Sequence, residues 1–144
     1  MVEILERSFD PYVELRRHQD RLTQQGKFGA TAIFVGTMRD VNEDASVESM
    51  TLEHYPGMTE KHLVQISEEA RRQWDILETL IIHRVGALAP NDPIVLIAVW
   101  SIHRGPAFEA CRYLIEELKT RAPFWKRERR GETVRWVEHN TPAK

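Results

Sequence analysis

The stretch "PIVLIAVWSI", residues 93–102, indicates how this chain folds. Apolar side chains fill it almost without a break, whereas a strand with one face in water alternates apolar and polar residues. Its β-branched residues favour a strand over a helix. We therefore expect a central strand whose two faces are both covered by other elements.

The segments around this strand alternate between strand and helix patterns. Further strands are expected at residues 2–7, 30–38, 47–55 and 78–86, and in PFWKRER and TVRWVEH, which form a hairpin at Gly131-Glu132. Helices are expected from Pro11 to Gln24, at 58–74 and at 106–121, and a polar loop at 42–46. The order β-α-β-β-α-β-β-α-β-β predicts an α+β fold, with helices on a largely antiparallel sheet. No repeat or linker is visible, so we expect a single domain over residues 1–144.

Composition and charge exclude several classes of protein. The chain has 144 residues and a net charge of −2, but residues 112–135 hold eight Lys or Arg against four Asp or Glu. An acidic chain with one basic segment is unsuited to general nucleic-acid binding and favours a local pocket for a small anion. No apolar run approaches the ~20 residues of a membrane span. The N-terminus lacks the apolar core of a secretory signal, and Cys111 is the only cysteine, so we expect a cytoplasmic protein.

The basic segment contains "LKTRAPFWKRE", residues 118–128. Lys119 lies on the flank of the apolar stripe of the predicted helix, and Lys126 follows on a strand after Pro123. A helix end followed by a returning strand can bring both lysines to one cavity. Two close ammonium groups lower each other's pKa, so such a lysine can transfer a proton or attack a carbonyl near neutral pH. The alternative is that both are solvated surface lysines.

Two further segments carry candidate anion-binding residues. In SIHRGPAFEA (101–110), His103 and Arg104 fall where a helix begins, and free N–H groups at a helix start bind phosphate. In GTMRD (36–40), Arg39 ends a strand after a glycine that allows close approach. The alternatives are an arginine paired with a carboxylate, an ordinary surface histidine and a merely solvated Arg39.

Metal and nucleotide sites are not indicated. His54, His62 and His83 do not have the spacing of metal ligands, so we expect no zinc or iron site. The sequence contains no P-loop, nucleophile-elbow serine or dinucleotide glycine fingerprint.

Four motifs of the chain resemble, in their order and separation, the catalytic (large) subunit family of molybdopterin synthase, over roughly residues 2 to 138. They are FVGTMRD, TLEHYPGMTEK, SIHRGPAFEA and LKTRAPFWKRE. The resemblance implies an α/β hammerhead-type fold with an additional antiparallel β subdomain. It also implies a homodimer that binds two small ubiquitin-like sulfur-carrier subunits, giving a heterotetramer. The implied enzyme is a sulfurtransferase of molybdenum cofactor biosynthesis. It converts cyclic pyranopterin monophosphate (precursor Z) into molybdopterin, taking the dithiolene sulfur from the thiocarboxylate on the carrier's C-terminal Gly-Gly.

The resemblance implies no metal and no organic cofactor, and it assigns roles to particular residues. The catalytic lysines are Lys119, expected at the carrier's terminal carbonyl, and Lys126, expected on the pterin side. The remaining expected contacts are the anion-binding Arg39, His103 and Arg104, the pterin contacts Thr37, Met38, Arg127 and Glu128, and the apolar rim residues Phe34 and Ile115. One departure is His139-Asn140, where some relatives carry an arginine that reaches the partner protomer.

Two functions of other classes compete with this one. The first is a non-catalytic module that grips a ubiquitin-like tail, and such a module would keep its affinity after loss of Lys119. The second is a single-strand nucleic-acid binder with Phe124 and Trp125 as stacking platforms, whose affinity would fall steeply with salt. We expect no nucleic acid and no membrane among the partners.

Overall fold

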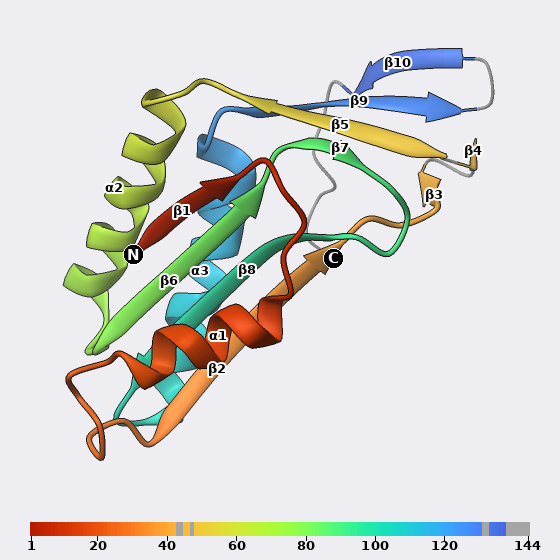
Figure 1. Ribbon diagram of the computed structural model, residues 1–144. Coiled ribbons are helices and arrows are strands. Elements are labelled where there is room, and N and C mark those ends of the chain that lie inside the picture. Colours follow the sequence, from red (N-terminus) through yellow and green to blue (C-terminus); the bar gives the residue numbers. More distant parts are fainter. Residues whose placement is uncertain (43–44, 47, 131–132, 138–144) are drawn as a thin grey trace.

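The computed structural model describes residues 1–42, 45–46, 48–130 and 133–137 (Figure 1). The expected turn at Gly131-Glu132 and the His139-Asn140 dipeptide lie outside these residues. The described residues form three helices, α1 (Pro11–Asp20), α2 (Met58–Gln73) and α3 (Arg104–Arg121). They also form ten strands: β1 (Val2–Leu5), β2 (Ala30–Thr37), β3 (Val41–Asn42), β4 (Ala45–Ser46), β5 (Ser49–His54), β6 (Glu78–Arg84), β7 (Gly86–Leu88), β8 (Pro93–Ser101), β9 (Phe124–Arg130) and β10 (Thr133–Val137).

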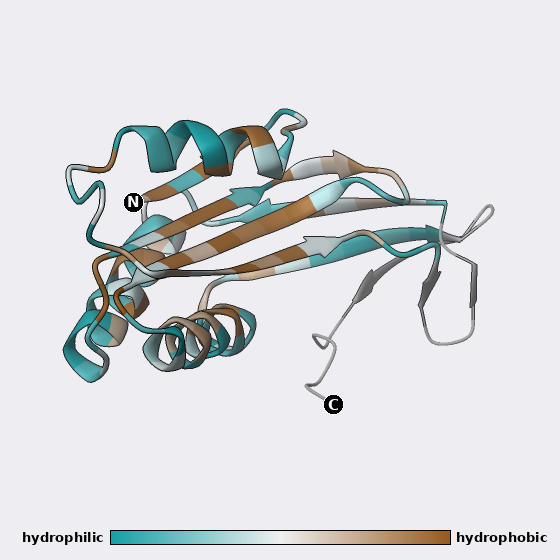
Figure 2. Ribbon diagram, turned by 90° about the horizontal axis from the view of Figure 1, so that it is seen from below, coloured by the Kyte–Doolittle hydropathy of each residue, from teal (hydrophilic) through white to brown (hydrophobic). Residues whose placement is uncertain are grey.

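The main sheet has the strand order β1-β6-β8-β2. β1 pairs with β6 in parallel, and the other pairs are antiparallel. β8 lies inside the sheet, and its residues from Val95 to Trp100 are at most 2% exposed. Figure 2 shows the reason, because α1 covers one face of the sheet while α2 and α3 cover the other. The expectation of a central strand covered on both faces is confirmed.

Alternation along β8 divides its side chains between two apolar cores. Val95, Ile97 and Val99 pack with the buried residues of α2 and α3. The residues between them, such as Leu96 and Trp100, pack on the α1 side. The sheet is therefore held by burial on both faces, which fixes the register of its strands.

A second sheet, with the order β10-β9-β5-β7, is antiparallel throughout. It extends past one end of the main sheet (Figure 1) and has a small apolar core of its own, made by Met38, Met50, Leu52 and Leu88. The expectation of one largely antiparallel sheet was therefore too simple. The α+β class, with an additional antiparallel β subdomain, is confirmed.

Several boundaries differ from the expected ones. α1 ends at Asp20 rather than at Gln24, because the chain turns there and buries Leu22, which is 8% exposed. The expected loop at 42–46 contains the short β3–β4 pair, and β7 was not expected. α3 begins before Pro106, which occupies the first turn, where a missing N–H breaks no intrahelical bond. That the chain forms a single domain stays a prediction.

Ile97 tests how far the fold depends on the burial of β8. It is 0% exposed, so Ile97→Ala removes buried methyl groups and leaves a cavity, and we expect the free energy of unfolding to fall by ~2–5 kcal/mol. The matched control is Ile102→Ala, at a side chain that is 47% exposed, and its effect should stay within ~0.5 kcal/mol. Urea unfolding measures both variants, and equal losses would show that burial of β8 does not dominate stability.

Candidate active site

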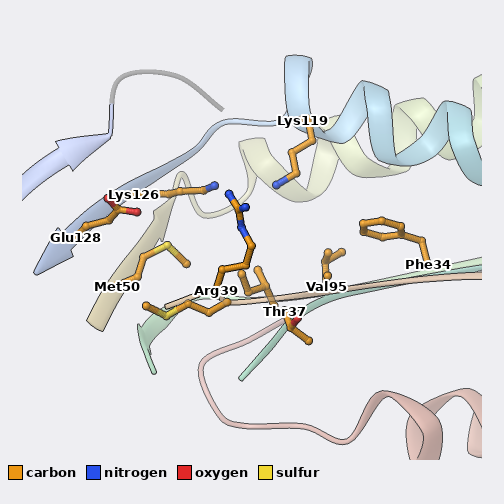
Figure 3. A pocket seen from close by; sticks show the side chains of 11 residues that line it. Phe34, Thr37, Arg39, Met50, Val95, Lys119, Lys126 and Glu128 are labelled. Atoms are coloured by element: carbon orange, nitrogen blue, oxygen red, sulfur yellow. The ribbon is translucent and has the colours of Figure 1, made fainter. Parts of the chain in front are cut away.

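A cavity of about 190 Å³ lies where the main sheet meets the second sheet. Its polar side chains come from the end of β2, the last turn of α3 and one face of β9: Thr37, Arg39, Lys119, Lys126 and Glu128. Figure 3 shows the side chains of Lys119, Lys126 and Arg39 pointing toward one another, with Glu128 beside Lys126. Three cations and one carboxylate therefore meet in one pocket.

Lys119 is placed by the way α3 ends. Burial of Leu114 and Leu118 against the main sheet fixes the rotation of the helix, so the neighbouring Lys119 emerges at the border of the core. The chain leaves the helix at Ala122, whose backbone is extended, and Pro123 favours this conformation in the residue before it. The side chain of Lys119 thus points from the last helical turn into the pocket.

Lys126 is placed by the pairing of β9. Leu52 of β5 lies opposite it in the antiparallel ladder. Alternation puts Lys126 and Glu128 on the pocket side, while Arg127 is exposed and does not line the pocket. Thr59 of α2 holds the chain just before β9, because its hydroxyl donates a hydrogen bond of 3.1 Å to the Pro123 carbonyl.

Arg39 follows an irregularity in β2. The pairing with β8 shifts between Gly36 and Thr37, and such a bulge re-aims the residues after it. Met38 exchanges backbone hydrogen bonds of 2.9 Å with the 91–92 turn, which holds the segment that carries Arg39. A side chain at Gly36 would place its Cβ 2.9 Å from a methyl group of Val95, so glycine allows this close packing.

Burial and charge both change the protonation equilibria of the lysines. Burial, with a smaller contribution from the charge of Lys126, lowers the pKa of Lys119 from 10.5 to about 8. Burial also lowers the pKa of Lys126, where the Glu128 carboxylate opposes the shift and Arg39 adds to it. An amine with a pKa near 8 can bind an anion as ammonium and can also accept a proton near neutral pH.

Not all of the expected site residues meet in this pocket. His103 and Arg104 are exposed at the start of α3, fifteen residues before Lys119, which corresponds to ~22 Å along a helix. The expected anion-binding residues Arg39, His103 and Arg104 therefore do not share one pocket within a single chain, and their common role stays a prediction. Ile115 lines a neighbouring groove with Phe34, and Phe34 also lines the pocket.

The structure adds residues that sequence reasoning did not place at the site. Met50, Ile94 and Val95 line the pocket from β5 and β8, and their only signal in the sequence was apolar character. His83 lines a small cavity together with the two lysines. Its signal in the sequence is a histidine inside the apolar run TLIIHRV, and this run alone does not connect it to the two lysines.

The described residues show neither a metal cluster nor a membrane-spanning helix. In this part of the chain, no group of three or more His, Cys, Asp or Glu side chains is placed to hold a metal ion. None of the three described helices is long and apolar enough to cross a membrane.

Comparison with known proteins assigns the family. The model of the family described as "MoaE protein" matches residues 10–121. The chain belongs to the MoaE family. A molybdopterin synthase catalytic subunit from Pseudomonas aeruginosa is 46% identical over 137 residues, which cover 95% of this chain and 89% of the relative. One from Ralstonia nicotianae is 53% identical over 112 residues, 78% of this chain, but the chain spans only 64% of that relative's length.

Solved structures of the family share the fold. The crystal structure of molybdopterin synthase from Staphylococcus aureus matches with a TM-score of 0.85 and 35% identity, covering 95% of this chain and 96% of that one. The resemblance drawn from the four sequence motifs is thereby confirmed. Membership of a family whose relatives are named as catalytic subunits favours an enzyme over the binding module and the nucleic-acid binder.

Lys119 also allows a test of stability against pH. Its pKa is lower in the folded chain, about 8, than in the unfolded chain, ~10.4, so the unfolded chain binds more protons between these values. Burial of the Lys119 ammonium group therefore lowers the free energy of unfolding by its full amount below pH 8, and this loss disappears as the pH rises toward 10.5. We expect Lys119→Met to raise the free energy of unfolding at pH 7 by up to ~3 kcal/mol, and by much less at pH 10.5.

Urea unfolding at the two pH values measures this difference. The control is Lys61→Met, at an exposed lysine of α2, where the effect should stay within ~0.5 kcal/mol at both pH values. A Lys119→Met variant less stable than the parent at pH 7, or equally altered at both pH values, would contradict the burial of this charge.

Proposed function

We propose that this protein is the catalytic subunit of a molybdopterin synthase. The enzyme converts precursor Z into molybdopterin, and the sulfur comes from the C-terminal thiocarboxylate of a small ubiquitin-like carrier subunit. One observation carries the proposal: Lys119, Lys126 and Arg39 converge on one pocket in a chain of the MoaE family. The site of action is the cytoplasm, and the chain's own residues supply the chemistry without a metal or an organic cofactor.

The charge of the pocket suits the two reactants. Precursor Z carries a cyclic phosphate and the sulfur donor is a thiocarboxylate, so both are anions. Cations fixed in a partly buried site hold the reactants together and stabilise charge that develops as the phosphate ring opens. Arg39 and Lys126 are suited to the pterin side, where Thr37, Met38 and Glu128 supply further contacts.

Lys119 is suited to the sulfur-donor side. The groove next to the pocket is lined by Phe34, Phe108 and Ile115, and Phe34 is common to both. An extended glycine-ended tail is narrow enough to follow this apolar groove and to place its terminal carbonyl near Lys119. The folded body of the carrier stays outside, and its contact surface supplies most of the affinity.

The proposed assembly is a homodimer with two carrier subunits. Since Arg104 lies ~22 Å from Lys119 along α3, it can act on precursor Z only in the pocket of the second copy. We propose that Arg104 and His103 contribute there to phosphate binding. Both side chains are exposed in the single chain, as this role requires.

The first test removes each lysine. Lys119→Ala and Lys126→Ala should each reduce turnover at least ~100-fold, because each removes a positioned charge or proton-transfer group. Both variants should fold, because the two side chains lie at the edge of the core. The assay mixes the protein with thiocarboxylated carrier and precursor Z and detects the dithiolene product. Lys61→Ala is the control, and near-parental turnover in either pocket variant would remove that lysine from the mechanism.

The second test asks which copy supplies Arg104. Lys119→Ala and Arg104→Ala homodimers should both be inactive. Co-expression at equal levels makes half of the dimers mixed, and each mixed dimer then has one pocket with Lys119 from one copy and Arg104 from the other. We expect about a quarter of the parental turnover, as the two-fold symmetry of a dimer predicts. No recovery above the separate variants would show that Arg104 does not act across the dimer.

A further inference from the structure

His83 is a buried side chain for which the proposed reaction has no role. It lies near the end of β6 and is 4% exposed. Its ring stacks almost flat on Phe124, with ring centroids 3.8 Å apart and an interplanar angle of 13°. Since Phe124 begins β9 two residues before Lys126, the stack fixes the strand that carries this lysine.

The hydrogen bonding of His83 determines its tautomer. Nδ1 lies 2.8 Å from the backbone carbonyl oxygen of Arg84. A carbonyl oxygen only accepts hydrogen bonds, so Nδ1 must carry the proton. Burial lowers the pKa of His83 to about 3; the hydrogen bond with the Arg84 backbone opposes this shift, and the nearby charges of Lys119, Lys126 and His54 add to it. The ring is therefore neutral at physiological pH, and Nε2 is left with a lone pair that can only accept.

His83 lines a small cavity that it shares with the two lysines. The cavity measures about 20 Å³, which is room for about one water molecule. Its lining includes His83, Phe124, Lys119 and Lys126, and its other lining residues, such as Leu52 and Ile94, are apolar. Among the side chains that line it, the two lysines are thus the hydrogen-bond donors available to Nε2.

We propose that His83 is a positioning residue for the lysine pair, supplying through Nε2 a fixed neutral acceptor that orients the Lys119 amine, directly or through one water molecule. A carboxylate at this place would also orient an ammonium group, but it would strongly favour the charged form. A neutral imidazole holds the amine while leaving it able to lose its proton.

The surroundings of His83 support this role from every side. β1 and β8 present Ile4 and Val95 opposite it in the sheet, and both are apolar. The charged or titratable groups that act on His83 are Lys119 of α3, Lys126 of β9 and His54 of β5. Arg39 and Glu128 act in turn on Lys126. The ring thus faces two lysines and has no acidic neighbour among the described residues that act on it.

The tautomer can be measured in the unmodified protein. Nitrogen-15 NMR of the imidazole should show the proton on Nδ1, and Nε2 unprotonated, from pH 5 to pH 9. A proton on Nε2, or titration of the ring near its ordinary pKa of ~6.5, would overturn the proposal. This measurement needs no substrate and no variant.

Two substitutions separate the acceptor from the stack. His83→Phe keeps an aromatic ring against Phe124 but has no acceptor, whereas His83→Gln keeps an acceptor oxygen. Loss of the acceptor disfavours the ammonium form, so we expect the pKa of Lys119, measured by NMR of its side chain, to fall in His83→Phe by at least ~0.5 unit. In His83→Gln the pKa of Lys119 should lie close to its value in the parent protein.

Turnover provides the second measure, and this part of the test rests on the proposed function. His83→Phe should lower kcat ~10-fold with KM for precursor Z unchanged, and His83→Gln should recover most of it. The control is His18→Phe, at a histidine that packs on Trp100 in the α1 core and should change neither quantity. An unchanged Lys119 pKa in His83→Phe would overturn the proposal, whereas absence of product from the parent protein would overturn only the proposed function. If His83→Phe does not fold, two results still decide. The tautomer of the unmodified protein is the first. The second is the pKa of Lys119 in His83→Gln, which should stay close to the parent's value, and a fall as large as that expected for His83→Phe would contradict the proposal.

Discussion

Two ammonium groups held in one partly buried pocket are the constraint on which the rest of this structure depends. A change in the pKa of Lys119 from 10.5 to about 8 corresponds to ~3 kcal/mol of unfavourable free energy, since one unit is ~1.4 kcal/mol. That is a large share of the ~5–15 kcal/mol that typically separates folded from unfolded protein. The remainder of the fold has to offset this cost and keep the lysines from moving apart.

The offset comes from the elements that carry each lysine. α3 packs buried side chains on a sheet whose central strand is fully covered, so its last turn cannot rotate without exposing core residues. β9 is paired on both sides, by β5 and β10. Its start is fixed again by Thr59 and by the stack on His83. Lys119 and Lys126 therefore approach each other because larger apolar and backbone interactions place them there.

The features that could be predicted from the sequence are those set by local pattern. The apolar run of β8 predicted its burial correctly, because a strand covered on both faces has no polar positions in its period. Lys119 and Lys126 could be paired because only a short break separates helix and strand. The separate second sheet, by contrast, is made by strands far apart in sequence, and no local pattern encodes their pairing.

The features of the site that the sequence could not predict have the same physical origin. Arg39 and Arg104 both follow strands of the main sheet, but β2 and β8 are antiparallel, so the residues after them lie at opposite ends of the sheet. His83 is a lone histidine in an apolar strand, which carries no spacing signal. Its meaning depends on Phe124 and on two lysines that only the tertiary structure brings near.

The choice of cations in the pocket follows from what each can do. An arginine keeps its charge at any physiological pH and binds anions with a rigid fork of donors, which suits Arg39 to holding a phosphate. A lysine gives up its proton once burial and a like charge weaken the ammonium form, and Lys119 has both. A second arginine at that position would bind an anion equally well but could not take part in proton transfer. The pocket therefore needs a lysine where bonds change, and it needs neighbours that hold this lysine in place without restoring its charge.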